Sequence, residues 1–176
     1  MRVLHVGCGS SPLPNLWPHA EEIRLDLDPE SKPDILGGMD NIPLPDNSVD
    51  AIYTSHTLEH VFQHEAVIAL GEFLRVLKPD GYAMVIVPDI QAVAQRIIDD
   101  EVYAPVYMAG DIPVSAMDMF YGHQALAEAG ERGKEYKFAH KFGYTPKTLG
   151  YALQIAGFRN VRAKSDGFNA IAVGLK

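Results

Sequence analysis

Short apolar runs alternate with turn-forming residues along the first half of the chain. Residues 3–6 form one such run, which ends at Gly7, and residues 23–27 form a second, which is stopped by Asp28 and Pro29. Runs of this length and composition are typical of strands buried on both faces of a parallel sheet. On this basis we predict strands at residues 3–6, 23–27, 34–36, 49–54 and 82–87.

One clear helical pattern lies between the last two of these strands. Apolar residues recur at three- and four-residue steps at Val67, Leu70, Leu74 and Leu77, which predicts an amphipathic helix that ends at the Lys-Pro-Asp-Gly turn of residues 78–81. Between the first two strands, three prolines at positions 12, 14 and 18 allow at most a short helix. Strand–helix–strand spacing predicts right-handed crossovers in a mostly parallel sheet with helices on both faces.

The second half of the chain changes character. Residues 100–142 contain scattered tyrosine, methionine and glycine without a clean period, and this segment could be core, a lid over an acceptor, or the surface of a homodimer. A helix is predicted from Thr145-Pro146 to Ala156, because a capping threonine and a proline begin it and Gly157 follows it. Residues 158–163 and 168–173 are predicted to form a closing hairpin through an Asp-Gly turn.

Composition narrows the class of protein. The 176 residues fit one domain, residues 1–176, with 100–142 as a lid or insertion. The 15 basic and 23 acidic residues give a net charge of −8, which argues against a partner bound through a nucleic-acid backbone. A single cysteine excludes a disulfide framework and suits the cytoplasm, and no apolar run has the length needed for membrane insertion.

A glycine-rich loop and a later acid suggest a nucleoside site. Gly7 and Gly9 follow the first predicted strand, and Asp26 ends the second, 19 residues after Gly7. Glycines in such a loop let a ligand approach the backbone N–H groups, and the carboxylate can accept hydrogen bonds from both ribose hydroxyls. A dinucleotide oxidoreductase uses the same device, but its third glycine position is occupied here by Pro12.

Five motifs in order resemble the class I S-adenosylmethionine-dependent methyltransferases, and most closely the small type-11-like enzymes, several of them associated with polysaccharide and cell-envelope genes. The motifs are residues 3–9 (VLHVGCG), 25–27 (LDL), 41–50 (NIPLPDNSVD), 56–60 (HTLEH) and 74–81 (LRVLKPDG). Residues 142–146 and 156–158 extend the resemblance over nearly the whole chain. It implies a Rossmann-like α/β fold with a mostly parallel seven-stranded sheet and an antiparallel last strand.

The resemblance also implies a cofactor site for S-adenosyl-L-methionine. In that site the glycine loop would face the methionine part, Asp26 would hold the ribose, Leu27 and Met39 would flank the adenine, and the tip of the fourth strand would close the methionine end. The family often has an acid at the position of Gly38, so Asp40 or a backbone carbonyl would substitute, or affinity would be reduced. The implied cofactor residues are Val6, Gly7, Cys8, Gly9, Ser10, Asp26, Leu27, Gly38, Met39, Asp40, Thr54, Ser55 and His56.

The sequence also contains a metal-binding pattern. His56, Glu59 and His60 match the inverted zinc-hydrolase motif, with His64 one helical turn later. That interpretation requires one continuous helix, whereas His56 directly follows a predicted strand, so we expect no metal ligands here.

Methyl transfer to oxygen needs a group that takes up a proton. The candidates are His56, His123 and His140, with Asp89 as a further one, although each has a structural alternative; Asp89, for example, could cap a helix that begins at Ile90. The sequence therefore predicts a methyltransferase that acts on a small-molecule or glycan-type acceptor, at oxygen. The main alternative is a binding module that keeps the fold, binds the cofactor weakly and has no catalytic activity.

Overall fold

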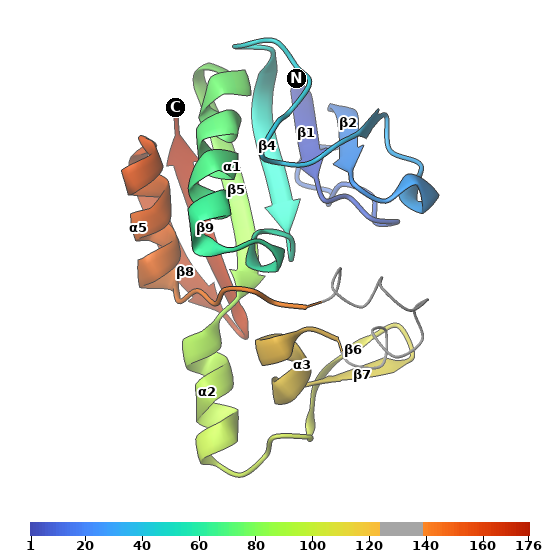
Figure 1. Cartoon of the computed structure of the whole chain (residues 1–176), viewed down its shortest axis with the longest axis vertical. Helices are drawn as coiled ribbons and strands as arrows, with labels where there is room; N and C mark the ends of the chain where they lie inside the picture. The colour runs from blue at the N-terminus through green and yellow to red at the C-terminus, as the bar shows by residue number, and fades with distance from the viewer. Residues whose placement is uncertain (124–138) are drawn as a thin grey trace.

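The computed structural model describes residues 1–123 and 139–176 (Figure 1). Its main feature is a seven-stranded sheet in the order β3-β2-β1-β4-β5-β9-β8. The first five strands in this order pair in parallel, while β9 runs antiparallel to both β5 and β8. The strands are β1 (Arg2–Val6), β2 (Glu21–Asp26), β3 (Ile35–Leu36), β4 (Val49–Ser55), β5 (Leu77–Pro88), β8 (Arg159–Asp166) and β9 (Asn169–Leu175). This confirms the predicted fold class and the closing hairpin.

The helix between β4 and β5 has three of its four predicted apolar residues in or against the core, namely Leu70, Leu74 and Leu77. Helix α1 (Gln63–Val76) buries Phe73 completely, whereas Val67 is 51% exposed. The prediction was wrong for Val67 because the buried stripe of α1 runs through Ala66, Ala69 and Phe73 and leaves Val67 beside it. The residues buried from α1 are Ala66, Ala69, Leu70, Phe73 and Val76. The chain then enters β5 directly at Leu77, before the predicted turn.

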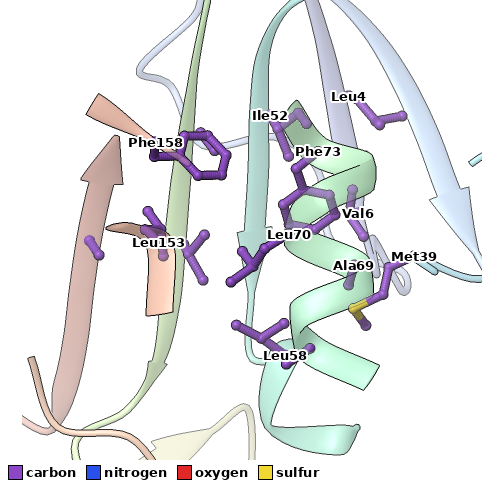
Figure 2. Close-up of a cluster of buried hydrophobic side chains, with 14 of the residues drawn as sticks. Leu4, Val6, Met39, Ile52, Leu58, Ala69, Leu70, Phe73, Leu153 and Phe158 are labelled. Carbon is purple, nitrogen blue, oxygen red and sulfur yellow. The ribbon is translucent and has the colours of Figure 1, made fainter. Parts of the chain in front are cut away.

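Helices α1 and α5 (Pro146–Ala156) pack on the same face of the sheet (Figure 1). Thr145 caps α5 by accepting a hydrogen bond from the Thr148 N–H at 3.2 Å, and Gly157 ends the helix with φ 108°, which confirms the predicted helix. Figure 2 shows Phe73 of α1 among side chains from β1 and β4, and Leu153 of α5 on the neighbouring part of the sheet.

The opposite face is covered differently from our prediction of helices on both faces. Within the described residues, the segment between β1 and β2 forms turns, because its prolines lack the N–H groups that a helix needs. Trp17 of this segment donates a hydrogen bond to the Tyr82 hydroxyl at 2.6 Å, and its ring lies 5.6 Å from that of Tyr53. The Tyr53 ring in turn lies 5.2 Å from the imidazole of the buried His5.

A smaller layer lies beyond the carboxyl ends of the strands (Figure 1). It consists of α2 (Ile90–Ile98), the hairpin of β6 (Pro105–Ala109) and β7 (Ile112–Ser115), and α3 (Ala116–Tyr121). Its own apolar cluster contains Val93, Val114, Ala116 and Met119. Part of the irregular segment therefore folds over the edge of the sheet where ligands bind in open α/β proteins. None of the helices in the described ranges is long and apolar enough to span a membrane.

The central position of Phe73 gives a direct test of the core. We expect Phe73→Ala to lower the free energy of unfolding by about 3–5 kcal/mol, because it removes a fully buried ring and leaves a cavity. The matched control is Tyr151→Ala on α5, where a ring that is 63% exposed is removed, and the expected change is within about 0.5 kcal/mol. Urea denaturation measures both, and equal losses would contradict the assigned core.

His5 predicts a pH dependence of stability. Burial lowers the pKa of His5 below its ordinary value of 6.5, although the nearby Glu22 carboxylate, 2.8 Å from Nδ1, acts in the opposite direction. The unfolded chain therefore takes up this proton more readily, and stability that is present above pH 6.5 is lost as the pH falls below it. Between about pH 7.5 and pH 5.5, the melting temperature of the wild type should fall more than that of His5→Phe, which keeps a ring beside Tyr53. Parallel melting curves for the two proteins would contradict this assignment.

Candidate functional site

The loop after β1 is held against β2 by its backbone. The Gly7 N–H donates to the Leu25 carbonyl at 2.8 Å, and the Arg24 guanidinium donates to the Gly9 carbonyl at 2.6 Å. Gly7 and Gly9 have φ of 65° and 50°, a conformation that favours glycine. At Gly7 a Cβ would lie 2.2 Å from Thr57 Oγ1, whereas at Gly9 nothing lies within 4 Å of the Cβ position. The loop is therefore packed at one glycine and open at the other.

Asp26 joins this loop to the end of β2. One carboxylate oxygen accepts the Gly9 N–H at 2.7 Å, and the other accepts the Asp28 N–H at 2.8 Å. The structure thus brings the predicted loop and the predicted acid into direct contact. Since a carboxylate offers about four acceptor positions, two remain for hydroxyl groups of a ligand.

The residues expected around an adenine lie beside this acid. Leu27, directly after β2, is 70% exposed, and Met39 is buried. The position of a Cβ on Gly38 would lie 3.7 Å from Leu27 Cδ2 and 2.3 Å from Asp40 Oδ1, so these three residues adjoin. An exposed leucine beside a side-chain-free position is a suitable platform for a flat apolar ring.

The remaining predicted cofactor residues differ in exposure. Val6 and Cys8 are buried, and burial raises the pKa of the Cys8 thiol, while Ser10 is exposed. At the tip of β4, Thr54 is buried and its hydroxyl has no hydrogen-bond partner among the described residues. Ser55 ends the strand and is half-buried.

Next comes His56, in a left-handed conformation with φ 52°. Its imidazole lines a cavity of about 140 Å³ together with two other predicted residues, His123 and His140. These three candidates come from segments far apart in the sequence, and the structure brings them together. The other residues that line the cavity are His60, Pro88, Tyr107, Val114, Asp118 and Met119.

The carboxylate of Glu59 lies next to this cavity and is 1% exposed. Its Oε1 lies 3.5 Å from His56 Nδ1 and 4.0 Å from His140 Nε2. Burial acts to raise the pKa of Glu59, but the neighbouring histidines, His56 foremost, outweigh it and the pKa lies below its ordinary value. Burial likewise acts to lower the pKa of His56, and Glu59 outweighs it, so that pKa is raised. The pair therefore favours a carboxylate beside an imidazolium.

The pKa of His140 is shifted in the opposite direction from that of His56. Burial lowers its pKa, which the Glu59 charge only partly offsets. Its Nδ1 lies 2.9 Å from the Met119 carbonyl, which can only accept a hydrogen bond. The ring is therefore a neutral imidazole with its proton on Nδ1 and a lone pair on Nε2.

Two sequence hypotheses are resolved by this geometry. Asp89 is the N-cap of α2, since it accepts the Gln91 N–H at 3.1 Å, and it also accepts the Ser165 hydroxyl at 2.7 Å, which confirms its structural alternative. The inverted zinc-hydrolase motif does not lie on one helix, because the short turn η2 (Leu58–His60) precedes α1. His64 stacks on Phe62 rather than lining the cavity.

Sequence reasoning did not place Glu59, Tyr107 or Asp118 at the site. The spacing of Glu59 from His56 was visible in the motif, but nothing local signals that its side chain is buried. Tyr107 and Asp118 lie in the segment without a regular period and are brought to the cavity by the β6–β7 hairpin and α3.

Comparisons with known proteins agree with the resemblance found in the sequence. Residues 4–85 match the family model of the type-11 methyltransferase domain. A methyltransferase structure from Archaeoglobus fulgidus, dependent on S-adenosylmethionine (SAM), is 16% identical, with 99% of this chain and 86% of that chain covered and a TM-score of 0.64. A second, from Methanosarcina mazei, is 16% identical, with 99% and 92% covered and a TM-score of 0.63.

Human N-acetylserotonin methyltransferase in complex with SAM is 17% identical, with 99% of this chain and 47% of that chain covered and a TM-score of 0.61. No match was found among curated proteins. The chain has the fold of the class I methyltransferases, and its residues 4–85 match the type-11 methyltransferase domain.

The two glycines of the loop should respond differently to substitution. Gly9→Ala should cost about 1–2 kcal/mol of stability, the penalty of a side chain in the left-handed region. Gly7→Ala should cost about 1–3 kcal/mol more, because its Cβ also collides with Thr57. Chemical denaturation of both variants measures the difference. Equal losses, or a larger loss at Gly9, would contradict the packing of this loop.

Proposed function

We propose that this protein transfers a methyl group from S-adenosylmethionine to a hydroxyl group of a small-molecule or glycan-type acceptor. One observation carries the proposal: the glycine loop and the histidine-lined cavity meet at the tip of β4. There Thr57 lies against Gly7, while His56, one residue earlier, lines the cavity. A cofactor whose methionine end rests on the loop would direct its methyl group toward the cavity.

The cofactor half of this proposal rests on Asp26. Its bond to the Gly9 N–H holds the loop in place, and its bond to the Asp28 N–H orders the chain after β2. Acceptor capacity remains for the ribose hydroxyls. Leu27 and Met39 would flank the adenine. Asp40, whose carboxylate lies against Gly38, would substitute for the acid that the family often has at the position of Gly38. The open space at Gly9 admits a ligand close to the backbone.

The acceptor half follows from the chemistry of methyl transfer. The acceptor oxygen forms a bond to the methyl carbon, the carbon–sulfur bond breaks with its electrons on sulfur, and the hydroxyl proton leaves. Because the sulfonium is already activated, the protein mainly positions the acceptor and excludes water. A cavity with several imidazoles suits an acceptor that gives up a proton. His123, whose two ring nitrogens are buried and have no hydrogen-bond partner within the described residues, is well suited to take it.

The layer formed by α2, β6, β7 and α3 would act as the lid. Tyr107, Val114 and Met119 come from this layer and line the cavity, so their side chains would select acceptors by shape. Assembly of two copies through this layer remains a prediction of the sequence analysis.

Asp26→Ala tests the cofactor half. We expect it to weaken the binding of S-adenosylhomocysteine, the demethylated cofactor, by about 1–3 kcal/mol, or roughly 5- to 150-fold, because two charge-assisted bonds to the ribose are lost. Isothermal titration calorimetry measures the affinity. Glu21→Ala is the matched control, since it removes an exposed carboxylate from the other end of the same strand and should leave the affinity unchanged.

Melting curves of both variants establish that they are folded. If the wild type binds no S-adenosylhomocysteine at millimolar concentration, the chain is a binding module that only shares the fold. If Asp26→Ala binds as tightly as the wild type, Asp26 is not in the site. Methyl transfer itself is measured with a deuterated methyl donor and a panel of monosaccharides and matched amino sugars. Label on amines alone would contradict an oxygen acceptor.

A further inference from the structure

We propose that Glu59, His60 and His140 bind a divalent transition-metal ion at the inner wall of the histidine-lined cavity. Metal binding itself does not depend on the proposed function. The role of the metal in polarising an acceptor hydroxyl does rest on it.

The first argument is proximity. One ligand atom from each of the three residues lies within 4.8 Å of the other two. Zinc bound at about 2.0–2.2 Å from nitrogen and oxygen ligands needs these atoms roughly 3.3 Å apart. The closure required, at most about 1.5 Å, is within the reach of side-chain torsions. Glu59 and His60 come from the turn after β4 and His140 from the segment before α5, so the fold and not local spacing assembles the group.

The second argument is the state of Glu59. Its side chain is 1% exposed, and neither carboxylate oxygen has a hydrogen-bond partner in the described part of the chain. Removing a carboxylate from water without such bonds is costly, and buried charges in proteins are normally paired or bound to metal. The imidazole of His56, 3.5 Å away, compensates part of this charge but donates no well-formed hydrogen bond.

The third argument is the orientation of the two imidazoles. His60 Nδ1 lies 3.2 Å from the Ala139 carbonyl, and His140 Nδ1 lies 2.9 Å from the Met119 carbonyl. Since a carbonyl can only accept, Nδ1 of each ring carries a proton, which leaves Nε2 as the nitrogen that can bind a metal. Metal-binding histidines in proteins are held in this way, by a backbone carbonyl or carboxylate on the nitrogen that does not bind the metal.

The set of donors indicates the kind of ion. Two imidazoles and one carboxylate favour Zn²⁺, Mn²⁺ or Fe²⁺ over Mg²⁺ and Ca²⁺, which prefer sets made of oxygen. Three protein ligands leave coordination positions open, as in catalytic sites. His60 and His140 both line the cavity, so an acceptor hydroxyl there could occupy an open position, and the ion would lower its pKa. His123 is not among the ligands and remains available to take the proton.

This proposal revises the expectation that the chain has no metal ligands. The sequence motif placed His56 and His60 on one helix with Glu59, and that arrangement does not form. The structure replaces His56 with His140, which lies 80 residues after His60 and has no place in the motif.

The test uses the untagged full-length protein, first stripped of metal with a chelator. We expect calorimetry with zinc chloride to show one site, and cobalt chloride to give the visible absorption of Co²⁺ bound by nitrogen and oxygen. His140→Ala and Glu59→Gln should each weaken zinc binding at least about tenfold, because each removes a ligand. His19→Ala is the matched control, since this exposed histidine near the amino end of β2 should leave binding unchanged.

Binding of S-adenosylhomocysteine to the same proteins separates this proposal from the proposed function. Variants that lose zinc but keep the nucleoside support a metal site distinct from the cofactor site. A wild type that binds no zinc, or that binds it as tightly after His140→Ala as before, overturns the metal proposal and leaves the proposed function to its own test. Melting curves identify a variant that is unfolded. If Glu59→Gln is unfolded, the zinc affinity of His140→Ala alone tests the metal site.

Discussion

The burial of one carboxylate, that of Glu59, determines how the second half of the chain meets the first. A buried charge is stable only beside a compensating group. Here that group is His56 from the tip of β4, while His140, from the segment that precedes α5, lies 4.0 Å from the carboxylate on another side. The backbone of Glu59 makes the same connection, because its carbonyl accepts the N–H groups of Lys141 at 2.8 Å and Phe142 at 3.2 Å. One residue therefore both fixes the returning segment and places His140 at the cavity.

The sheet positions the other half of the site by its topology. Its strand order reverses between β1 and β4, and open α/β sheets bind ligands in the crevice beyond the carboxyl ends of the strands at such a reversal. Asp26 lies there and orders the backbone through its carboxylate oxygens. The two carboxylates differ in their partners. Asp26 is half-buried and accepts hydrogen bonds from backbone N–H groups, whereas Glu59 is fully buried and its charge is compensated only by neighbouring side chains.

Features that depend on local pattern could be predicted from the sequence. The strands, the Thr145 cap and the Asp-Gly hairpin follow from the chemistry of neighbouring residues. The contact of the glycine loop with Asp26 follows because β1 and β2 are adjacent parallel strands, whose carboxyl ends lie side by side. The exposure of Val67 could not, because Val67 is as apolar as the residues that are buried, and its spacing does not show that Ala66 and Ala69 are buried in its place. The cavity could not either, since His140 is brought to Glu59 by long-range contacts that no spacing reveals. The prolines before β2 were correctly taken as unfavourable to a helix, but the packing of Trp17 from this segment against Tyr53 and Tyr82 was not foreseen.

The central claim is that a nucleoside site at the glycine loop opens onto the histidine-lined cavity. A crystal structure of the complex with S-adenosylhomocysteine tests it most directly. The account predicts that the ribose hydroxyls contact Asp26 and that the sulfur faces the cavity beside His56, with no protein side chain between them. A ligand bound elsewhere, or a sulfur separated from the cavity by the chain, would contradict it.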